Sequence, residues 1–335
     1  MQLTLSNDVY LRPIQAKIGS RKRTITHPTT SKQWRSALVR LEGAYAANTI
    51  RSYRADFTIF EAWCNEQHRT ALPASPGTVA AFVAAQSKSA APATVSRRRA
   101  SIAKIHSLLE LENPTRAEEV NLAAKRMYRQ KGRRQDQAFG LTAPLKHRLV
   151  AACPNDLLGL RDRALISTGY DTLCRRSELV QLSIEDMEFN PDGSGTILVR
   201  RAKADQFGDG RLAYLSAATT RHINRWLEAA NLDGGPIFRT IHGKRISSDA
   251  LHPFSVPLIL KSRAREAGLD EETISKLSGH SMRVGAAQDM AAAGIDLVAI
   301  MHAGGWKSPD MVMRYIEHMD VLKSGMAKLY SRLKA

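Results

Sequence analysis

Cysteine, aromatic residues and long apolar runs are all scarce in this sequence. Its three cysteines, Cys64, Cys153 and Cys174, are scattered, so they fit neither a disulfide framework nor a zinc-binding pattern. No apolar run reaches the roughly 18 residues of a membrane-spanning helix, and the N-terminus lacks the charged-then-apolar pattern of a signal peptide. We therefore expect a protein of a reducing cytoplasm that has no membrane partner.

Acidic residues are also few, with 32 aspartates and glutamates against 49 lysines and arginines. The net charge of +17 and the pI of about 10.1 indicate a polyanionic partner. Nucleic acid is the commonest such partner, and an anionic membrane surface is the rival. Because only 6% of the residues are aromatic, the cores are expected to be helical and rich in alanine and leucine.

The patterning of the 335 residues predicts two domains, mainly α, with one small antiparallel sheet. Apolar residues that recur every three or four positions from Ile50 to Trp63 predict an amphipathic helix. Two short apolar segments, 196–199 and 211–215, predict a hairpin, and a polar, glycine-containing stretch after Arg134 marks the domain boundary. The expected parts are a flexible arm over residues 1–30, a helical domain over 31–130, a linker over 131–142, and a mixed α+β domain over 143–335 with helices near 248–267 and 321–333.

Positive charge dominates the stretch from Arg97 to Arg134, where eleven lysines and arginines stand against four glutamates. A charge run is often only a solvated helix face. This one spans two predicted helices and the linker, which favours a stripe of phosphate contacts. Side chains that read base edges would lie on the same helices or in the second domain. The candidate DNA-contacting residues are Arg51, Ser96, Arg97, Arg98, Arg133, Arg134, Arg263 and Arg265.

Several residues of the second domain could bind or attack a phosphate, although each also has an ordinary interpretation. Arg175 and Glu178 can share one helical face, which equally suits a surface ion pair. Lys203 follows the first predicted strand, in a loop where a lysine is usually just solvated. His280 and Arg283 stand three residues apart at a predicted helix start, where backbone N–H groups favour an anion.

Two aromatic residues near the C-terminus complete this set. Trp306 could simply belong to the core, but a buried indole N–H usually needs a polar partner. Tyr315 is a single phenol in a short predicted helix. Cleavage of a phosphodiester needs fixed cations around the phosphate, a nucleophile and a general acid. The seven residues together can supply all of these parts.

Three segments resemble motifs of the tyrosine recombinase (phage integrase) family, most closely those of its Cre-like members. The segment Leu173-Cys174-Arg175-Arg176-Ser177-Glu178 is similar to the first arginine motif of the family. The segment Gly279-His280-Ser281-Met282-Arg283 is similar to its H-x-x-R motif. The closing motif is similar to Ala303-Gly304-Gly305-Trp306, followed nine residues later by Tyr315, and tryptophan in place of the usual histidine is a Cre-like feature. The resemblance is strong over about 160–320 and holds in outline over 35–130.

This resemblance implies a site-specific DNA recombinase of prokaryotic, phage or plasmid origin that needs no metal, other cofactor or ATP. The 31–130 domain would be the core-binding domain and the 143–335 domain the catalytic one, and together they would form a clamp on double-stranded DNA. Free protein would be a monomer or weak oligomer, and a homotetramer would exchange strands between two sites through a Holliday junction. The 321–333 helix would dock on a neighbouring protomer, although packing within its own chain would explain its apolar stripe equally well.

The resemblance also implies a role for each residue of the set. Tyr315 would attack and form a 3′-phosphotyrosyl link, and Lys203 would protonate the leaving 5′-oxygen. The other roles would be clamping of the phosphate by Arg175 and Arg283, proton acceptance or phosphate binding by His280, a hydrogen bond from Trp306, and orientation of the cluster by Glu178.

Two other functions share parts of the same pattern. A non-catalytic DNA-binding regulator on this scaffold would explain the charge, but it would not need a positioned phenol. A type IB topoisomerase-like enzyme would share the chemistry, but it would need neither paired sites nor a tail that protomers exchange.

Overall fold

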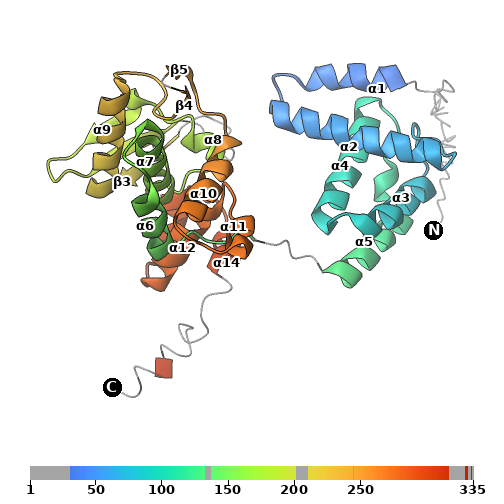
Figure 1. The fold of residues 1–335 in the computed structure, drawn as a ribbon. Coiled ribbons are helices and arrows are strands. Elements are labelled where there is room, and N and C mark those ends of the chain that lie inside the picture. Colours follow the sequence, from blue (N-terminus) through green and yellow to red (C-terminus); the bar gives the residue numbers. More distant parts are fainter. Residues whose placement is uncertain are drawn as a thin grey trace, which may run out of the picture. The chain divides into compact units, whose positions relative to one another are not determined.

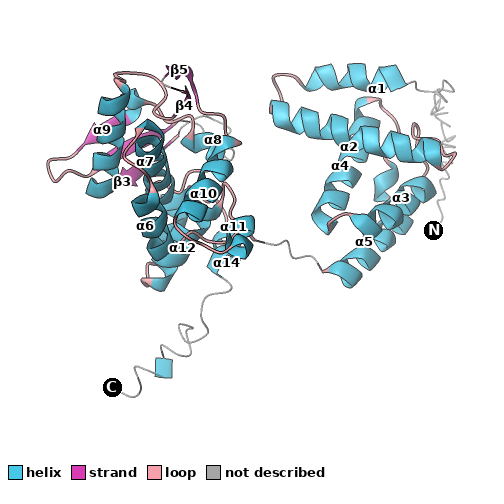
Figure 2. Cartoon of the chain, viewed as in Figure 1, coloured by secondary structure: helices cyan, strands magenta, loops and turns pink. Residues whose placement is uncertain are grey.

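The computed structural model describes residues 31–132, 137–200, 210–243, 245–316, 329–330 and 333. The chain divides into an N-terminal unit, residues 1–135, and a C-terminal unit, residues 136–335. Helices dominate both units, and all strands of the described ranges lie in the C-terminal one (Figures 1 and 2). None of the helices in these ranges is long and apolar enough to cross a membrane. The predicted fold class, mainly α with a mixed second domain, is therefore confirmed.

Helices alone form the described part of the N-terminal unit. Three of them, α3, α4 and the short η2, begin with a proline, at a position where the missing N–H costs no hydrogen bond. The helices are α1 (Ser31–Ala37), η1 (Leu38–Leu41), α2 (Ala47–Glu66), α3 (Pro76–Ser89), α4 (Pro92–Leu108), η2 (Pro114–Arg116) and α5 (Glu118–Lys131).

The core of the N-terminal unit is built on the apolar face of α2 that the sequence predicts. Phe57 and Phe60 are fully buried, and Phe60 meets Phe82 of α3 edge to face, with the ring centroids 5.0 Å apart. Trp63 contacts the same Phe82 ring at 5.3 Å. Such edge-to-face aromatic pairs add stability beyond the area they bury, so three rings, those of Phe60, Trp63 and Phe82, hold α2 against α3.

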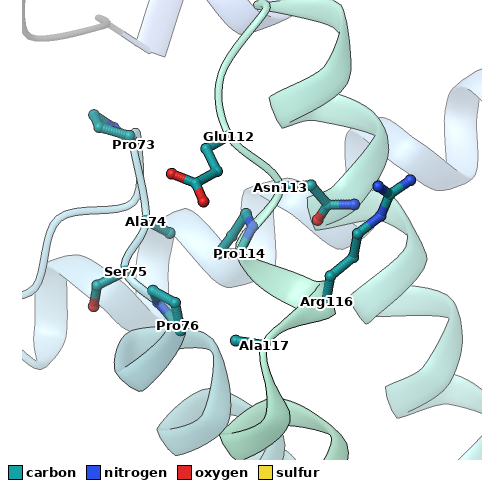
Figure 3. A pocket seen from close by; sticks show the side chains of 9 residues that line it. All are labelled: Pro73, Ala74, Ser75, Pro76, Glu112, Asn113, Pro114, Arg116 and Ala117. Carbon is teal, nitrogen blue, oxygen red and sulfur yellow. The ribbon is translucent and has the colours of Figure 1, made fainter. Parts of the chain in front are cut away.

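A surface hollow of about 690 Å³ lies where the segments before α3 and α5 approach each other (Figure 3). Prolines line much of it, and its charged groups are Glu112 and Arg116. Its one hydroxyl, on Ser75, already accepts a hydrogen bond from the backbone N–H of Thr78 at 3.1 Å. The hollow therefore offers no free nucleophile, and it is not a candidate active site.

The C-terminal unit surrounds α7 with helices and carries two small sheets. Helix α7 packs against α6, α9 and α12. The elements are α6 (Ala143–Ala152), α7 (Leu157–Asp171), α8 (Arg176–Leu179), η3 (Ile184–Asp186), β1 (Met187–Phe189), β2 (Gly195–Val199), β3 (Arg211–Leu215), α9 (Ala217–Ala230), β4 (Arg239–His242), β5 (Arg245–Ala250), α10 (Ser255–Glu266), α11 (Glu271–Lys276), α12 (Ser281–Ala292), α13 (Leu297–Gly304) and α14 (Pro309–Ile316).

The predicted hairpin is present as β2 and β3 of a three-stranded antiparallel sheet in the order β1-β2-β3. Ile197 pairs with Met187 on one side and with Ala213 on the other. Ile197 and Leu215 are fully buried, whereas Tyr214 points outward. This alternation is the pattern of a sheet with one face on the core.

The sequence prediction was wrong in two places of this unit. A second antiparallel pair, β4 with β5, was missed because its short, polar strands lack the apolar alternation by which strands are recognised. The helix predicted over 248–267 begins only at Ser255, because residues 248–250 belong to β5 and Pro253 disfavours helical backbone at the residue before it. The predicted helix over 321–333 lies outside the described residues except at positions 329, 330 and 333.

Candidate active site

Six of the seven predicted site residues come together in the C-terminal unit, on and around α8, α12 and α14. A small apolar cluster supports them, in which Leu173, Ala287 and Val312 are buried and Tyr315 packs at the edge. The cluster joins segments that are more than a hundred residues apart in the chain. The site is therefore a product of the tertiary fold, and local structure alone could not assemble it.

Arg175 lies just before α8, a helix of a single turn, and is held there by Glu178. The carboxylate of Glu178 accepts one hydrogen bond from the backbone N–H of Arg175 at 3.0 Å and another from its guanidinium at 2.7 Å. Glu178 is buried, whereas about a fifth of the Arg175 side chain is exposed (22%). A buried carboxylate that binds one edge of the fork leaves the remaining N–H groups of Arg175 available to a ligand.

Arg283 is the most deeply buried charged residue of the site, with 1% of its surface exposed. Its Nη1 donates to the backbone carbonyl of Leu173, a residue held at φ +50°, which is unusual for leucine. Its Nη2 is buried and has no hydrogen-bond partner among the described residues. Burial first, and then repulsion by Arg175, lower the pKa of Arg283. A buried cation with an unused donor makes this position strongly favourable for an anion.

Trp306 and Tyr315 close the site on the side of α13 and α14. The Arg283 guanidinium carbon lies 3.9 Å from the centroid of the Trp306 ring, a cation–π arrangement. The rings of Trp306 and Tyr315 are 5.8 Å apart, and Gln288 donates to the backbone carbonyl of Tyr315 at 3.1 Å. The Trp306 indole therefore contacts both the Arg283 guanidinium and the Tyr315 ring, and it holds the phenol near Arg283.

The end of α13 can hold Trp306 in this position only because two glycines precede it. A Cβ on Gly304 would fall 2.0 Å from the indole. Gly305 adopts φ +63°, the left-handed conformation that ends the helix. The Gly304-Gly305-Trp306 motif therefore has a direct steric explanation.

His280 is the N-cap residue immediately before α12, three residues before Arg283. Its backbone N–H donates to the Ser278 hydroxyl at 3.1 Å. The residue is open to solvent at its edge, but the surrounding protein desolvates the imidazole, and the charges of Arg283, Arg176 and Arg175 oppose its protonation. The pKa of His280 is therefore lowered, and its imidazole is neutral near pH 7.

Arg211, at the start of β3, supports the site and was missed in the sequence. It donates to the carbonyl of Ala303 at 2.9 Å and to that of Thr172 at 2.6 Å, so it joins the end of α13 to the end of α7. A Cβ on Gly305 would fall 2.9 Å from this side chain. An arginine at a strand start carries no local pattern that distinguishes it, so only the fold reveals this role.

Some predicted residues lie outside the described ranges. Lys203 belongs to the undescribed residues between β2 and β3, and Arg133 and Arg134 fall among the undescribed residues after α5. The hydroxyl of Ser96 is described and lies 2.5 Å from that of Tyr128, so it links α4 to α5. Ser96 is therefore partly engaged within its own unit.

The arginines predicted to contact DNA from the N-terminal unit differ in their surroundings. Arg51 is exposed on α2. Arg97 is also exposed, but it makes two hydrogen bonds of 2.9 Å to the buried carboxylate of Asp56. Only 16% of the Arg98 side chain is exposed, and it lies 4.0 Å from the same carboxylate. Arg51 is the most available of the three.

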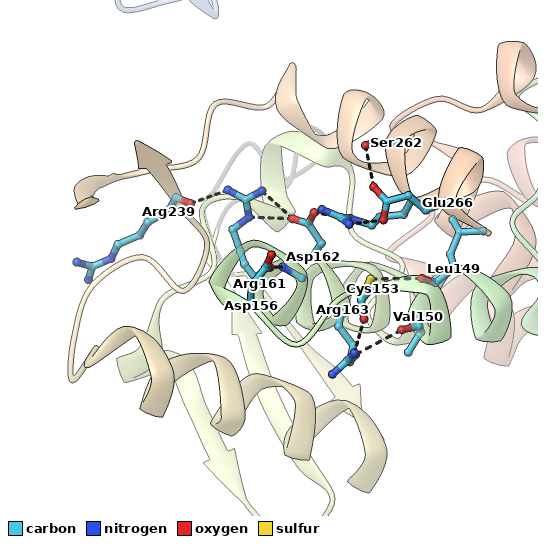
Figure 4. A network of polar contacts seen from close by, with 12 residues as sticks. Leu149, Val150, Cys153, Asp156, Arg161, Asp162, Arg163, Arg239, Ser262 and Glu266 are labelled. Atoms are coloured by element: carbon cyan, nitrogen blue, oxygen red, sulfur yellow. Dashed lines mark hydrogen bonds and ion pairs between the residues drawn. The ribbon is translucent and has the colours of Figure 1, made fainter. Parts of the chain in front are cut away.

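In the C-terminal unit, the DNA contact predicted for Arg263 does not fit the structure. Arg263 is buried (8% exposed) and binds Asp162 at 2.8 Å and also Glu266, in the network shown in Figure 4. Because these two carboxylates neutralise its charge and the side chain is buried, we leave Arg263 out of the proposed DNA contacts. Arg265 is exposed and pairs with Glu271 at 2.9 Å across the surface, which leaves it accessible.

Two family models match this chain. The phage integrase family model covers residues 141–321, and the N-terminal SAM-like domain of phage integrases covers residues 21–113. The chain belongs to the tyrosine recombinase (phage integrase) family. It is therefore an enzyme of the DNA strand transferase class.

Individual relatives cover nearly the whole recombinase chain. An integrase/recombinase xerD homolog of Selenomonas ruminantium is 34% identical over 305 residues, which span 88% of each chain. Recombinase cre of Escherichia phage P1 is 26% identical over 306 residues, 85% of this chain and 88% of that protein.

Solved recombinase structures share the fold. The XerH recombinase in a post-cleavage complex with palindromic difH substrate has a TM-score of 0.65 at 17% identity, over 91% of this chain and 85% of that one. The Tn1549 transposon integrase in complex with transposon right end DNA has a TM-score of 0.64 at 15% identity, over 90% of this chain and 99% of that one.

Proposed function

We propose that this recombinase cleaves and rejoins DNA at specific sites through a covalent link between Tyr315 and a 3′-phosphate, without metal or ATP. One observation carries the proposal: a buried donor of the Arg283 guanidinium, beside the Trp306–Tyr315 pair, has no acceptor among the described residues. Such a buried donor needs an acceptor, which a bound ligand or an ordered water can supply. A phosphodiester oxygen is the acceptor that a recombinase would bring.

The described side chains suggest how the steps divide. Arg175 and Arg283 would bind the non-bridging oxygens of the scissile phosphate. The Tyr315 oxygen would attack phosphorus while the bond to the 5′-oxygen breaks, so that the phosphate stays on Tyr315. The neutral imidazole of His280 can accept the phenol proton or donate a hydrogen bond to the phosphate. The 5′-oxygen would take its proton from Lys203, as the family resemblance implies.

Assembly is the second part of the proposal. Named relatives are recombinases and integrases seen with recombination-site DNA, and the net charge of +17 suits a duplex partner. We expect the two units to clamp the duplex, with phosphate or base contacts from Arg51, Arg97 and Arg265. Four protomers would pair two sites and exchange strands through a Holliday junction, with the C-terminal segment docked on a neighbour.

The experiment begins by finding a target site. Protein is incubated with a library of nicked random-sequence duplexes, in which cleavage releases a short fragment and traps the covalent complex. Captured DNA is then sequenced. We expect one enriched site, and we expect an adduct from the wild type but none from Tyr315→Phe.

Tyr330→Phe is the matched control, because Tyr330 is the other described tyrosine near the C-terminus and is exposed. Failure of the wild type to form an adduct, or equal adduct from Tyr315→Phe, would overturn the proposal. Adducts with no enriched sequence, together with relaxation of supercoiled DNA, would instead indicate a type IB topoisomerase-like activity.

A further inference from the structure

Arg176 is next to Arg175 in the chain, but the two guanidiniums have different surroundings. Arg175 is bound by Glu178. The Arg176 guanidinium carbon instead lies 4.7 Å from the centroid of the Phe254 ring. No hydrogen bond or ion pair joins the Arg176 side chain to any residue in the described ranges. It is a half-buried cation held by an aromatic face, with its donors unused.

Phe254 is itself an unusual surface residue. The ring is 61% exposed at the residue before α10, and the ring of His252 stacks on it at 5.3 Å with an angle of 19° between the planes. Because this exposed ring contacts both Arg176 and His252, the three side chains are held in a defined arrangement, as expected of a binding surface. We call Arg176, Phe254 and His252 the aromatic ladder.

The aromatic ladder adjoins the catalytic set directly. The side chain of Arg176 lies against Gly279, the residue before His280, where an added Cβ would fall 2.8 Å from the Arg176 Cδ. The charge of Arg176 is also among the causes that lower the pKa of His280. Whatever Arg176 binds therefore lies next to the phosphate that the catalytic residues hold.

The charge of the site is larger than one phosphate requires. Arg175, Arg176 and Arg283 stand against the single carboxylate of Glu178, which leaves two positive charges without a partner among these side chains. A phosphodiester carries one negative charge, and the next phosphate of the same strand follows about 3.4 Å further along the helix axis. A second phosphate is thus the nearest anion that DNA offers to Arg176.

We propose that Arg176, fixed by the aromatic ladder, binds a phosphate adjacent to the scissile one and thereby positions the cleaved strand. This inference rests on the proposed function and deepens it. Arginine suits the task because its planar fork can stack on Phe254 through one face while its N–H groups remain in plane for an oxyanion. Arg176 is a positioning residue, since it acts on cleavage through the place of the strand.

The test replaces phosphates of the captured site one at a time by neutral methylphosphonate, at each position around the cleavage point, and measures the rate of adduct formation. For the wild type, one flanking position should lower the rate about tenfold, the loss expected for one charge-assisted contact. Arg176→Gln should lose about as much on unmodified DNA. In Arg176→Gln, methylphosphonate at that one position should cause no further fall in the rate of adduct formation. At every other position it should lower the rate by the same factor as in the wild type.

Three further variants make the result specific. Arg225→Gln removes the same charge from an exposed position of α9 and should leave the wild-type profile unchanged. Phe254→Ala, at an exposed position, should reproduce part of the Arg176→Gln pattern at the same phosphate, whereas Phe254→Tyr should keep the wild-type profile. The Phe254 pair preserves the test if Arg176→Gln folds poorly.

The outcomes separate the two proposals. Without any adduct from the wild type on unmodified DNA, the proposed function fails. If the wild type cleaves normally, two results would overturn the inference about Arg176. One is an Arg176→Gln variant that cleaves at the wild-type rate. The other is a variant whose rate falls by the same factor on every methylphosphonate substrate, including the flanking one. Position-specific coupling is required, because a merely structural defect would slow all substrates alike.

Discussion

Two arginine clusters in the C-terminal unit differ in how their charge is balanced. In the first, the carboxylate of Asp162 binds Arg161 at 2.7 Å and Arg263 at 2.8 Å, and Glu266 binds Arg263 as well (Figure 4). Two cations thus meet two carboxylates. The cluster is closed, and it fastens α7 to α10.

In the second cluster, which consists of Arg175, Arg176 and Arg283, only Arg175 forms an ion pair among the described residues, with Glu178, and a donor of Arg283 has no acceptor there. The same residue type therefore has opposite roles within one unit. The closed cluster is satisfied by the fold and should matter for stability. The open cluster has a donor left over for a ligand, so we expect it to matter for activity. Four predictions can break or sharpen this comparison.

The largest effect is expected for Arg283→Met. Loss of one fixed cation at the phosphate should lower the rate of adduct formation about 10²–10³-fold. The melting temperature of the free protein should stay the same or rise, because methionine removes a buried charge that Arg175 repels. Suicide-substrate kinetics and thermal unfolding measure the two quantities. If Arg283→Met clearly lowered the melting temperature but left the cleavage rate unchanged, this cluster would serve stability and not activity.

The opposite profile is expected for Asp162→Asn, which leaves Arg161 and Arg263 without their shared charge partner. The free energy of unfolding should fall by about 3 kcal/mol, while the cleavage rate per folded molecule stays unchanged. Urea unfolding measures the loss. Arg265→Ala, which breaks an exposed pair with Glu271, is the control and should hardly change stability. An equally small effect of Asp162→Asn would show that the closed cluster is not structural.

Gly304→Ala should act on the open cluster from a distance. The added methyl group would occupy the place of the Trp306 ring, so the indole must move away from Arg283 and Tyr315. Cleavage should slow roughly tenfold to a hundredfold, as for other small misplacements of catalytic groups. Gly77→Ala is the matched control, because a Cβ there meets nothing closer than 3.8 Å. Unchanged kinetics in Gly304→Ala would mean that the position of Trp306 is unimportant.

The smallest effect is a shift in the titration of His280, followed by NMR. In the free protein its pKa should lie below the ordinary value of 6.5, should rise in Arg283→Met and rise less in Arg176→Gln. Asp162→Asn should leave it unchanged, and bound DNA should raise it. Because the folded pKa is the lower one, the unfolded chain takes up the proton first, so the contribution of His280 to stability is lost as the pH falls below about 6.5. A His280 pKa above 6.5 in the free protein would contradict the open cluster.

Much of the fold could be predicted because apolar periodicity is strong where helices are long. The face of α2 and the β2–β3 hairpin are examples, since burial repeats every three to four residues in one and every second residue in the other. The β4–β5 pair could not be predicted, because its strands are short and polar and lack apolar alternation. The start of α10 was placed too early, because residues 248–250 belong to β5.

The site shows the same division. Arg175, His280, Arg283 and Tyr315 could be identified because they stand in short segments with a characteristic spacing. The support from Arg211 and the contact of Arg176 with Phe254 could not, because each joins residues far apart in the chain. Arg263 shows the converse error, since an arginine in a basic region looks exposed until the fold places Asp162 beside it.

The most direct measurement identifies the residue that holds the DNA. Covalent complex trapped on the captured site is digested with protease, and the peptide that carries the nucleotide is located by mass spectrometry. The open arginine cluster predicts a single phosphotyrosine linkage at Tyr315, next to Trp306. A linkage at Tyr330 or at any other residue would place the scissile phosphate away from Arg283 and would contradict the account.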